Sequence, residues 1–313
     1  MPNTLFAILE KTTACLNENG IEAPGLNAEV LICHVLKCNK TNLYTNYELH
    51  LTDAQIDSIT ALVKRRVLRE PLQYIIGRQG FWSLDFKVTK DVLIPRPETE
   101  ILVEEAVKIR TLNPELRTIL DLCTGSGCIA ITLAKELPDA IIYATDNSAH
   151  ALAVVKENAE MHGVLDRIKF IHGNLFDALD LRSGVKGGYP SKGWVGGQGV
   201  KRQEHGVWNV NLIVSNPPYI KTSDIETLEP EIKNFEPINA LDGGADGLEI
   251  IRRIVNKAHL ELKKDGWLMM EMGIGQALDV KTLIEKSGNY NEIAVIKDYS
   301  GIERVVKAKK WIR

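Results

Sequence analysis

Apolar runs that read as strands alternate with helical stretches from about Glu98 to the C-terminus, and this alternation restricts the fold most strongly. Five of the runs cover residues 118–121, 140–144, 168–171, 212–214 and 267–270. Strands that alternate with helices predict a doubly wound, mostly parallel sheet. Residues 292–297 and 303–309 have only a turn around Ser300 and Gly301 between them, so they should pair as an antiparallel hairpin. The sequence therefore predicts an α/β fold with a seven-stranded sheet.

The first 75 or so residues have the apolar spacing of helices instead. One helical face is apolar over residues 5–16 and another over 28–36, where we expect Asn27 to be the N-cap. Thr52 and Gln55 form a capping-box pattern at the start of a third helix. The predicted domains are a helical bundle over residues 1–78, a linking β-hairpin over 79–97 and the α/β domain over 98–313.

One segment interrupts the alternation of strands and helices. Residues 183–206 hold 8 glycines in 24 positions and have no apolar periodicity. This composition predicts a flexible surface insertion within the α/β domain.

Composition limits the partners and the metal chemistry. The net charge of -3 provides no overall basic field that would hold nucleic acid. No apolar run approaches the ~18 residues that a membrane span needs, so we expect a cytoplasmic protein. The five cysteines lack the spacing of a zinc site, and we expect reduced thiols and no metal.

A glycine-rich loop follows the first predicted strand of the sheet. Its candidate ligand-binding residues are Cys123, Thr124, Gly125, Ser126 and Gly127. Glycines let the backbone turn sharply and approach a ligand without a Cβ in the way. The loop also fits the dinucleotide fingerprint, so it predicts a nucleotide-like ligand without choosing between a nicotinamide cofactor and S-adenosylmethionine.

Two later strand ends supply further candidate ligand-binding residues. Asp146 ends the second strand, where a carboxylate can accept hydrogen bonds from both ribose hydroxyls; the alternative role is a helix N-cap. After the third strand, Asn174 can donate and accept at the edge of an adenine. Leu175 or Phe176 can cover the face of that ring.

The strongest chemical signal is Asn216-Pro217-Pro218-Tyr219 at the carboxyl end of the buried strand 210–215. Ligands of open α/β sheets bind beyond that edge. Proline pushes the residue before it into an extended conformation and has no N–H of its own. The Asn216 side-chain oxygen and the Pro217 carbonyl are then free to accept the two hydrogens of an NH2 group. Tyr219 can stack on a planar amide or base.

An NH2 group of this kind needs help to react. An amide or aryl amine nitrogen is a poor nucleophile because its lone pair is delocalised. Two acceptors that hold its hydrogens turn the lone pair toward an electrophilic methyl carbon, by alignment and preorganised dipoles and without a strong base or metal. The proline-rich corner therefore predicts methyl transfer to a planar NH2 group.

Together these motifs resemble those of the release factor glutamine methyltransferases, the PrmC/HemK family, over nearly the whole chain. The resemblance rests on residues 94–100 (Ile-Pro-Arg-Pro-Glu-Thr-Glu), the glycine loop and residues 214–220. Further matches are residues 235–237, 243–248 and 298–304.

The resemblance implies a Rossmann-like class I methyltransferase that uses S-adenosylmethionine. Its acceptor would be the side-chain amide N5 of the glutamine in the Gly-Gly-Gln motif of class I peptide chain release factors, held by the helical domain. It also implies that the glycine loop, Asp146, Asn174 or Leu175, and Asn216 contact the cofactor, and we expect a monomer. Arg96, Thr99 and Glu100 would shape the cofactor pocket, although residues 97–100 also suit the first turn of a helix.

Three other functions fit part of the sequence. Adenine-N6 and guanine-N2 methyltransferases of nucleic acid share the corner, but they need a basic groove or a target-recognition domain that is not visible here. A Rossmann dehydrogenase rests on the glycine loop alone and leaves Asn216 to Tyr219 unexplained. A noncatalytic module would bind the cofactor without turnover.

The insertion contains Gly196-Gly197-Gln198, the tripeptide of the presumed substrate. Coincidence is the favoured interpretation in a stretch so rich in glycine. The alternative is that the insertion visits the active site as a pseudosubstrate.

Overall fold

The computed structural model describes residues 3–179 and 209–311, which fall into two compact units. One unit holds Met1–Arg78 and Leu228–Phe235, and the other holds Gln79–Thr227 and Glu236–Arg313. No sequence pattern indicated that residues 228–235 join the first unit. The insertion 183–206, with Gly196-Gly197-Gln198, lies outside the described residues. The domain limits drawn from the sequence stay predictions.

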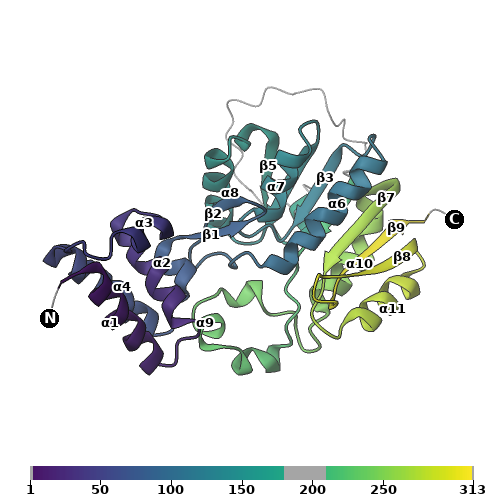
Figure 1. Cartoon of the computed structure of the whole chain (residues 1–313). Helices are drawn as coiled ribbons and strands as arrows, with labels where there is room; N and C mark the ends of the chain where they lie inside the picture. Colours follow the sequence, from purple (N-terminus) through teal and green to yellow (C-terminus); the bar gives the residue numbers. More distant parts are fainter. Residues whose placement is uncertain (1–2, 180–208, 312–313) are drawn as a thin grey trace. The chain divides into compact units, whose positions relative to one another are not determined.

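The first unit is a bundle of helices (Figure 1). They are α1 (Leu5–Glu18), α2 (Pro24–Leu36), α3 (Lys40–Thr45), α4 (Asp53–Val67), α5 (Leu72–Ile76) and α9 (Pro230–Lys233). Apolar side chains such as Leu16, Leu31 and Ile59 form its buried core. Thr52 and Gln55 make the predicted capping box at the start of α4. The helical character predicted for this part of the chain is confirmed.

The prediction that Asn27 caps α2 is wrong. The helix begins at Pro24, with Ala23 as its N-cap, because proline at the first helical position loses no needed N–H. Asn27 is buried inside the helix, where its Oδ1 accepts a hydrogen bond from Arg66 Nε at 2.9 Å. Arg66 also forms an ion pair with Glu231 at 3.0 Å, which fastens α9 to this unit.

The second unit is built on a seven-stranded sheet with the order β5-β4-β3-β6-β7-β9-β8. The strands are β3 (Thr118–Leu122), β4 (Ile141–Asp146), β5 (Ile168–His172), β6 (Val210–Ser215), β7 (Leu262–Glu271), β8 (Tyr290–Lys297) and β9 (Glu303–Lys310). The first five are parallel, and β9 pairs antiparallel with both β7 and β8. This confirms the predicted fold class. A separate two-stranded sheet pairs β1 (Arg78–Phe81) with β2 (Leu84–Lys87).

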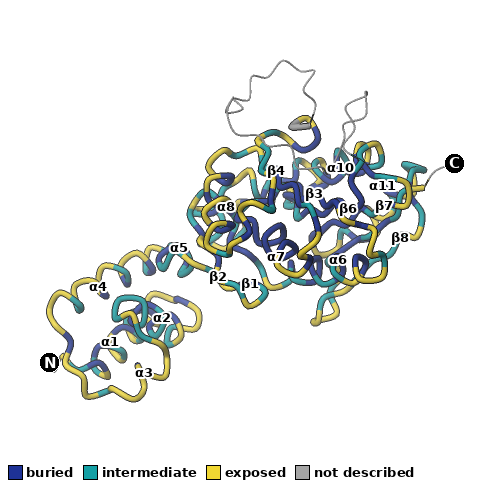
Figure 2. Tube along the Cα trace, turned by 90° about the horizontal axis from the view of Figure 1, so that it is seen from above, coloured by how far each residue is buried: buried dark blue, intermediate teal, exposed yellow. Residues whose placement is uncertain are grey.

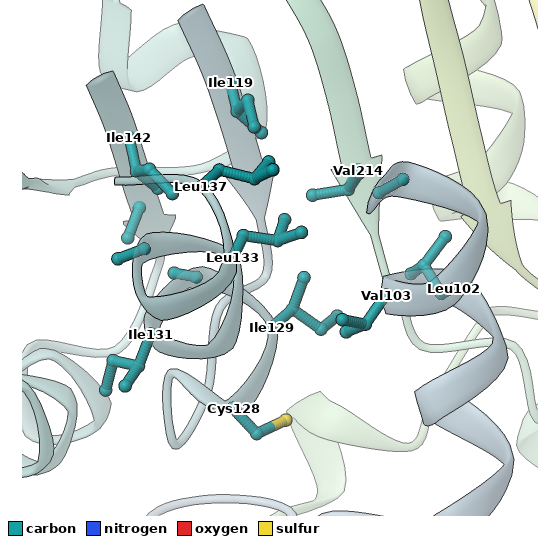
Figure 3. Packing of buried hydrophobic residues seen from close by; sticks show 14 of the residues in the cluster. Leu102, Val103, Ile119, Cys128, Ile129, Ile131, Leu133, Leu137, Ile142 and Val214 are labelled. Atoms are coloured by element: carbon teal, nitrogen blue, oxygen red, sulfur yellow. The ribbon is translucent and has the colours of Figure 1, made fainter. Parts of the chain in front are cut away.

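Helices cover both faces of the large sheet. One face packs against α6 (Glu100–Leu112), α7 (Cys128–Glu136) and α8 (Ala149–Met161), and the other against α10 (Glu249–Glu261) and α11 (Ala277–Ser287). Short 3-10 turns are η1 (Pro97–Thr99), η2 (Leu165–Arg167), η3 (Leu175–Leu179), η5 (Thr222–Thr227) and η6 (Ile238–Ala240). Figure 3 shows Leu133 of α7 and Val103 of α6 packed beneath Ile119 and Val214 of the central strands.

The two central strands, β3 and β6, are buried along their whole length (Figure 2). A strand covered on both faces is mainly apolar, which explains why these runs show no regular alternation with polar residues; the buried polar residues, such as Asp121 and Asn211, are exceptions.

The order of the strands reverses between β3 and β6, and the functional residues lie at this point of the sheet. Leu122 of β3 is paired with Ser215 of β6, and Ser215 is paired with Met270 of β7. The next residues, Cys123, Asn216 and Glu271, therefore lie at one level at the carboxyl ends of three neighbouring strands. Such a switch point is where open α/β sheets bind ligands.

Gly127, where the glycine loop enters α7, should tolerate no side chain. Its φ is +83°, and an added Cβ would lie 2.1 Å from Val155 Cγ2 on α8. We expect Gly127→Ala to lower the free energy of unfolding by about 2–4 kcal/mol, from backbone strain and overpacking. Gly80→Ala is the matched control, because its Cβ would meet no atom within 4 Å. Equal urea midpoints for both variants and the wild type would contradict this packing.

Candidate functional site

A cavity of about 460 Å³ lies within the second unit, beyond the carboxyl ends of β3, β4 and β6. This volume is in the range of about 300–1,000 Å³ that is common for small-molecule sites. The predicted site residues that line it are Arg96, Thr99, Cys123, Thr124, Gly125, Ser126, Asp146, Asn174, Leu175, Asn216 and Pro218. Glu100, Gly127, Pro217 and Tyr219 are not among its lining residues.

The glycine loop forms one wall of the cavity. Cys123 adopts a left-handed conformation with a φ of 59°, which costs free energy for a residue other than glycine. Gly125 also has a positive φ, and a Cβ there would meet no protein atom within 4 Å. The two glycines thus have separate roles: Gly125 leaves open space beside the cavity, whereas Gly127 allows α7 to pack closely on α8.

Asp146 fixes the neighbouring backbone and does not cap a helix. Its Oδ2 accepts a hydrogen bond from the Gly125 N–H at 2.9 Å, and its Oδ1 accepts one from the Ser148 N–H at 2.9 Å. Ser148 is the N-cap of α8 and takes the capping role instead. Burial raises the pKa of the Asp146 carboxyl, although the backbone hydrogen bonds oppose this effect.

The Asp121 side chain is a buried carboxyl to which the sequence argument gave no role. Its Oδ2 accepts a hydrogen bond from the Thr124 hydroxyl at 2.6 Å. Its Oδ1 has no hydrogen-bond partner within the described part of the chain. Burial raises the pKa of Asp121 to about 7. An acidic residue at the end of an otherwise apolar strand was the available sequence signal.

Leu175 and Phe176 have different surroundings. Leu175 lines the cavity beside Asn174 and has a φ of 51°, again a left-handed conformation. Phe176 is buried in the core between the sheet and α10 and is not among the lining residues. Of the two apolar residues proposed to cover a bound ring, only Leu175 lines the cavity.

The proline-rich corner is held by a chain of hydrogen bonds that meets at a buried carboxyl. Asn216 Nδ2 donates to Thr99 Oγ1 at 3.1 Å, and Thr99 Oγ1 donates to Glu271 Oε2 at 2.7 Å. The Tyr219 hydroxyl donates to the other oxygen, Glu271 Oε1, at 3.2 Å. Thr99 and Glu271 are 1% and 0% exposed, so water does not compete for the hydrogen bond between them, whereas the bonds from Asn216 and Tyr219 are partly buried. One carboxyl therefore holds both ends of the corner.

Close contacts with Tyr219 explain why two of the residues that pack on the corner are glycines. An added Cβ at Gly243 would lie 2.8 Å from Tyr219 Cα, and one at Gly247 would lie 2.6 Å from the Tyr219 carbonyl oxygen. Gln276 Nε2 donates to that same oxygen at 2.9 Å, while Gln276 Oε1 accepts from the Gly273 N–H at 2.8 Å. Loops from distant parts of the sequence thus pack directly on the corner.

Residues 96–100 act both as a helix start and as part of the site. Pro97–Thr99 form η1 and Glu100 begins α6. Arg96 lines the cavity and forms an ion pair with the buried Glu236 at 2.6 Å. Glu100 accepts a hydrogen bond from the Trp82 N–H at 2.7 Å, so it holds the hairpin and does not line the cavity.

Sequence reasoning missed Glu271 and Gln276. Glu271 directly follows the apolar run of β7, and Gln276 lies five residues later. A charged residue at the end of a buried strand, next to glycines, was the signal that could have identified Glu271.

Comparison with known proteins identifies the family of this chain. The family model for the PrmC N-terminal domain matches residues 7–77, and that for the methyltransferase small domain matches residues 98–183. A release factor glutamine methyltransferase of Geobacter sulfurreducens is 40% identical over 303 residues, covering 97% of this chain and 95% of that protein. One of Thermodesulfovibrio yellowstonii is 40% identical over 284 residues, covering 90% and 91%. The chain belongs to the release factor glutamine methyltransferase family.

Membership of this family makes the chain a methyltransferase. A solved structure, the hMettl16 catalytic domain in complex with the MAT2A 3′UTR hairpin 6, aligns with a TM-score of 0.53 at 15% identity, covering 81% of this chain and 82% of that one. A likeness at this identity concerns the fold alone.

The described residues contain neither a membrane-spanning helix nor a metal-binding cluster. Within 3–179 and 209–311, no helix is long and apolar enough to cross a membrane. In the same residues, no group of three or more histidine, cysteine or acidic side chains could hold a metal ion. The five cysteines are free thiols.

The buried Glu271 should make stability depend on pH. Burial raises its pKa from 4.5 to about 7; Glu98 also raises it, while Arg304 and the hydrogen bonds from Thr99 and Tyr219 lower it. The folded state then binds more protons than the unfolded state between these values, so wild-type stability falls as the pH rises through this window.

Glu271→Gln lacks this titration. Its free energy of unfolding relative to the wild type should rise by on the order of 3 kcal/mol between pH 4.5 and 7.5. Urea titrations of both proteins at several pH values measure this difference. Asp121 titrates equally in both proteins and cancels, so parallel pH dependences would show that Glu271 does not have a raised pKa.

Proposed function

We propose that this protein transfers a methyl group from S-adenosylmethionine to the side-chain amide N5 of the glutamine in the Gly-Gly-Gln motif of class I peptide chain release factors. The observation that carries the proposal is the orientation of Asn216. Its amide nitrogen is engaged by Thr99, which leaves its amide oxygen as a hydrogen-bond acceptor beside the cavity. Membership of the release factor glutamine methyltransferase family supports the choice of acceptor.

The residues around the cavity fit the cofactor. Asp146 would accept hydrogen bonds from the ribose hydroxyls, and Gly125 would allow close approach because no side chain fills the space beside it. Asn174 and Leu175 would bind the adenine at its edge and face. S-adenosylmethionine, when bound, supplies an electrophilic methyl group on a sulfonium sulfur.

The chain's own residues would prepare the acceptor nitrogen. Asn216 Oδ1 and the Pro217 carbonyl would accept the two amide hydrogens, which holds the nitrogen lone pair in one direction. The prolines keep these two oxygens in place, because neither Pro217 nor Pro218 has a backbone N–H for a competing local bond. Tyr219 would contribute through its position beside the acceptor, although its hydroxyl is bound by Glu271. Stacking of its ring on the acceptor stays a prediction.

Transfer to the proposed acceptor can be measured directly. Purified protein, labelled S-adenosylmethionine and a class I release factor should give labelled release factor. A release factor whose tip glutamine is changed to alanine should receive no label. Equal labelling of both substrates, or label found only in added DNA or RNA, would contradict the proposal; the latter would favour a nucleic-acid amino methyltransferase.

Asn216→Ala tests the catalytic role of the corner. We expect turnover to fall about 100-fold or more, because the acceptor loses an aligning oxygen. Affinity for the cofactor, measured by calorimetry, should stay within about threefold, because this side chain is assigned mainly to the acceptor. Asn256→Ala, at an exposed position of α10, is the matched control and should behave like the wild type. Near wild-type turnover of Asn216→Ala would remove the assigned role.

A further inference from the structure

A carboxamide can face its partner in two ways, and only one of them suits the proposed reaction. The acceptor NH2 group has two hydrogens to donate, so it needs an oxygen opposite it. If the Asn216 amide were rotated by half a turn, its own NH2 group would face the acceptor and repel it. Another group in the protein must therefore hold the Asn216 amide with its oxygen toward the acceptor.

The Thr99 hydroxyl can make this selection because it has a single hydrogen. That hydrogen is donated to Glu271 Oε2 at 2.7 Å. The hydroxyl oxygen can then only accept from its other neighbour, and that neighbour is Asn216, at 3.1 Å. An acceptor at this position binds the amide nitrogen and not the amide oxygen. The direction of each hydrogen bond is thus set by the one before it.

Glu271 sets the direction of the first hydrogen bond in this series. An ionised carboxylate is an acceptor only, so it forces both Thr99 and Tyr219 to donate to it. Its hydrogen bonds come from two neutral hydroxyls, although it is fully buried. A buried charge without a closely paired cation destabilises a fold. If the role of Glu271 were only to stabilise the fold, glutamine would serve better at this position because its side chain carries no charge.

We propose that Glu271 and Thr99 are positioning residues, which fix the Asn216 carboxamide so that its oxygen faces the acceptor nitrogen. This inference rests on the proposed function. Neither residue needs to touch the acceptor: Glu271 acts through Thr99, and Thr99 acts through Asn216.

The groups that face Glu271 come from several elements. They are Thr99 and Glu98 of η1, Tyr219 after β6, Cys128 of α7 and Arg304 of β9. Once Glu271 is protonated, its Oε2–H can donate to the Thr99 hydroxyl oxygen. The hydrogen of the Thr99 hydroxyl is then free to be donated to the Asn216 amide oxygen. The amide then loses its preferred orientation. Turnover should therefore rise with pH as the carboxyl loses its proton, near pH 7.

Substitutions at Thr99 separate the hydroxyl from the side-chain volume. Thr99→Val keeps the shape but has no hydroxyl, and we expect kcat to fall about 10- to 100-fold. Thr99→Ser keeps the hydroxyl and should stay within about threefold of the wild type. For both variants, KM for the release factor and affinity for S-adenosylhomocysteine should change by less than about threefold. Wild-type kcat in Thr99→Val, equal loss in Thr99→Val and Thr99→Ser, or a proportional loss of cofactor affinity would each overturn the inference.

Glu271→Gln supplies an independent test should Thr99→Val fail to fold. Glutamine cannot ionise, so the rise of kcat through pH 7 should disappear in this variant and remain in the wild type. An unchanged acid limb in Glu271→Gln would overturn the positioning role. Wild-type transfer to the release factor is measured first in the same assay. Failure of that first measurement rejects the proposed function, whereas failure of the variants alone rejects only the positioning role.

Discussion

The Glu271 carboxyl, buried at the end of β7, is the constraint around which the corner is arranged. It receives hydrogen bonds from the residue before α6 and from the residue after the two prolines, so it joins two segments more than a hundred residues apart in the chain. The strand pairing makes this possible, because β3, β6 and β7 end at the same level. The sheet therefore sets the position of the corner, and the Glu271 carboxyl sets the direction of the hydrogen bonds within it.

This arrangement separates two physical tasks. The cavity wall of glycines, Asp146 and Leu175 suits a nucleotide-like ligand, and left-handed backbone at Cys123 and Leu175 concentrates strain there. The corner suits a planar NH2 group. Its Tyr219 backbone is contacted by Gln276, Gly243 and Gly247. Burial of ionisable groups at the meeting point of the two regions costs stability, and such groups cluster at functional sites.

Much of the fold could be predicted because its central strands are mainly apolar and its helices are periodic. The corner could be predicted because two prolines and an asparagine end a buried strand. The role of Glu271 could not, because hydrogen bonds between residues 99, 216 and 271 depend on strand register, which no local pattern encodes. The same limit applies to α9, which joins the first unit through ion pairs of Glu231 with Arg66 and Arg69. Asn27 shows a different error, since another local signal, the proline at position 24, sets the start of α2 before Asn27.

A structure with S-adenosylhomocysteine and a Gly-Gly-Gln peptide of a release factor would show how the corner holds its acceptor. We expect the glutamine amide nitrogen to lie within about 2.7–3.2 Å of both Asn216 Oδ1 and the Pro217 carbonyl oxygen. We also expect Asn216 Nδ2 to stay hydrogen-bonded to Thr99 and the glutamine nitrogen to face the sulfur. A corner that points away from the sulfur, an Asn216 amide with its nitrogen toward the glutamine, or binding of a flipped base in place of the peptide would contradict the proposed role of the corner.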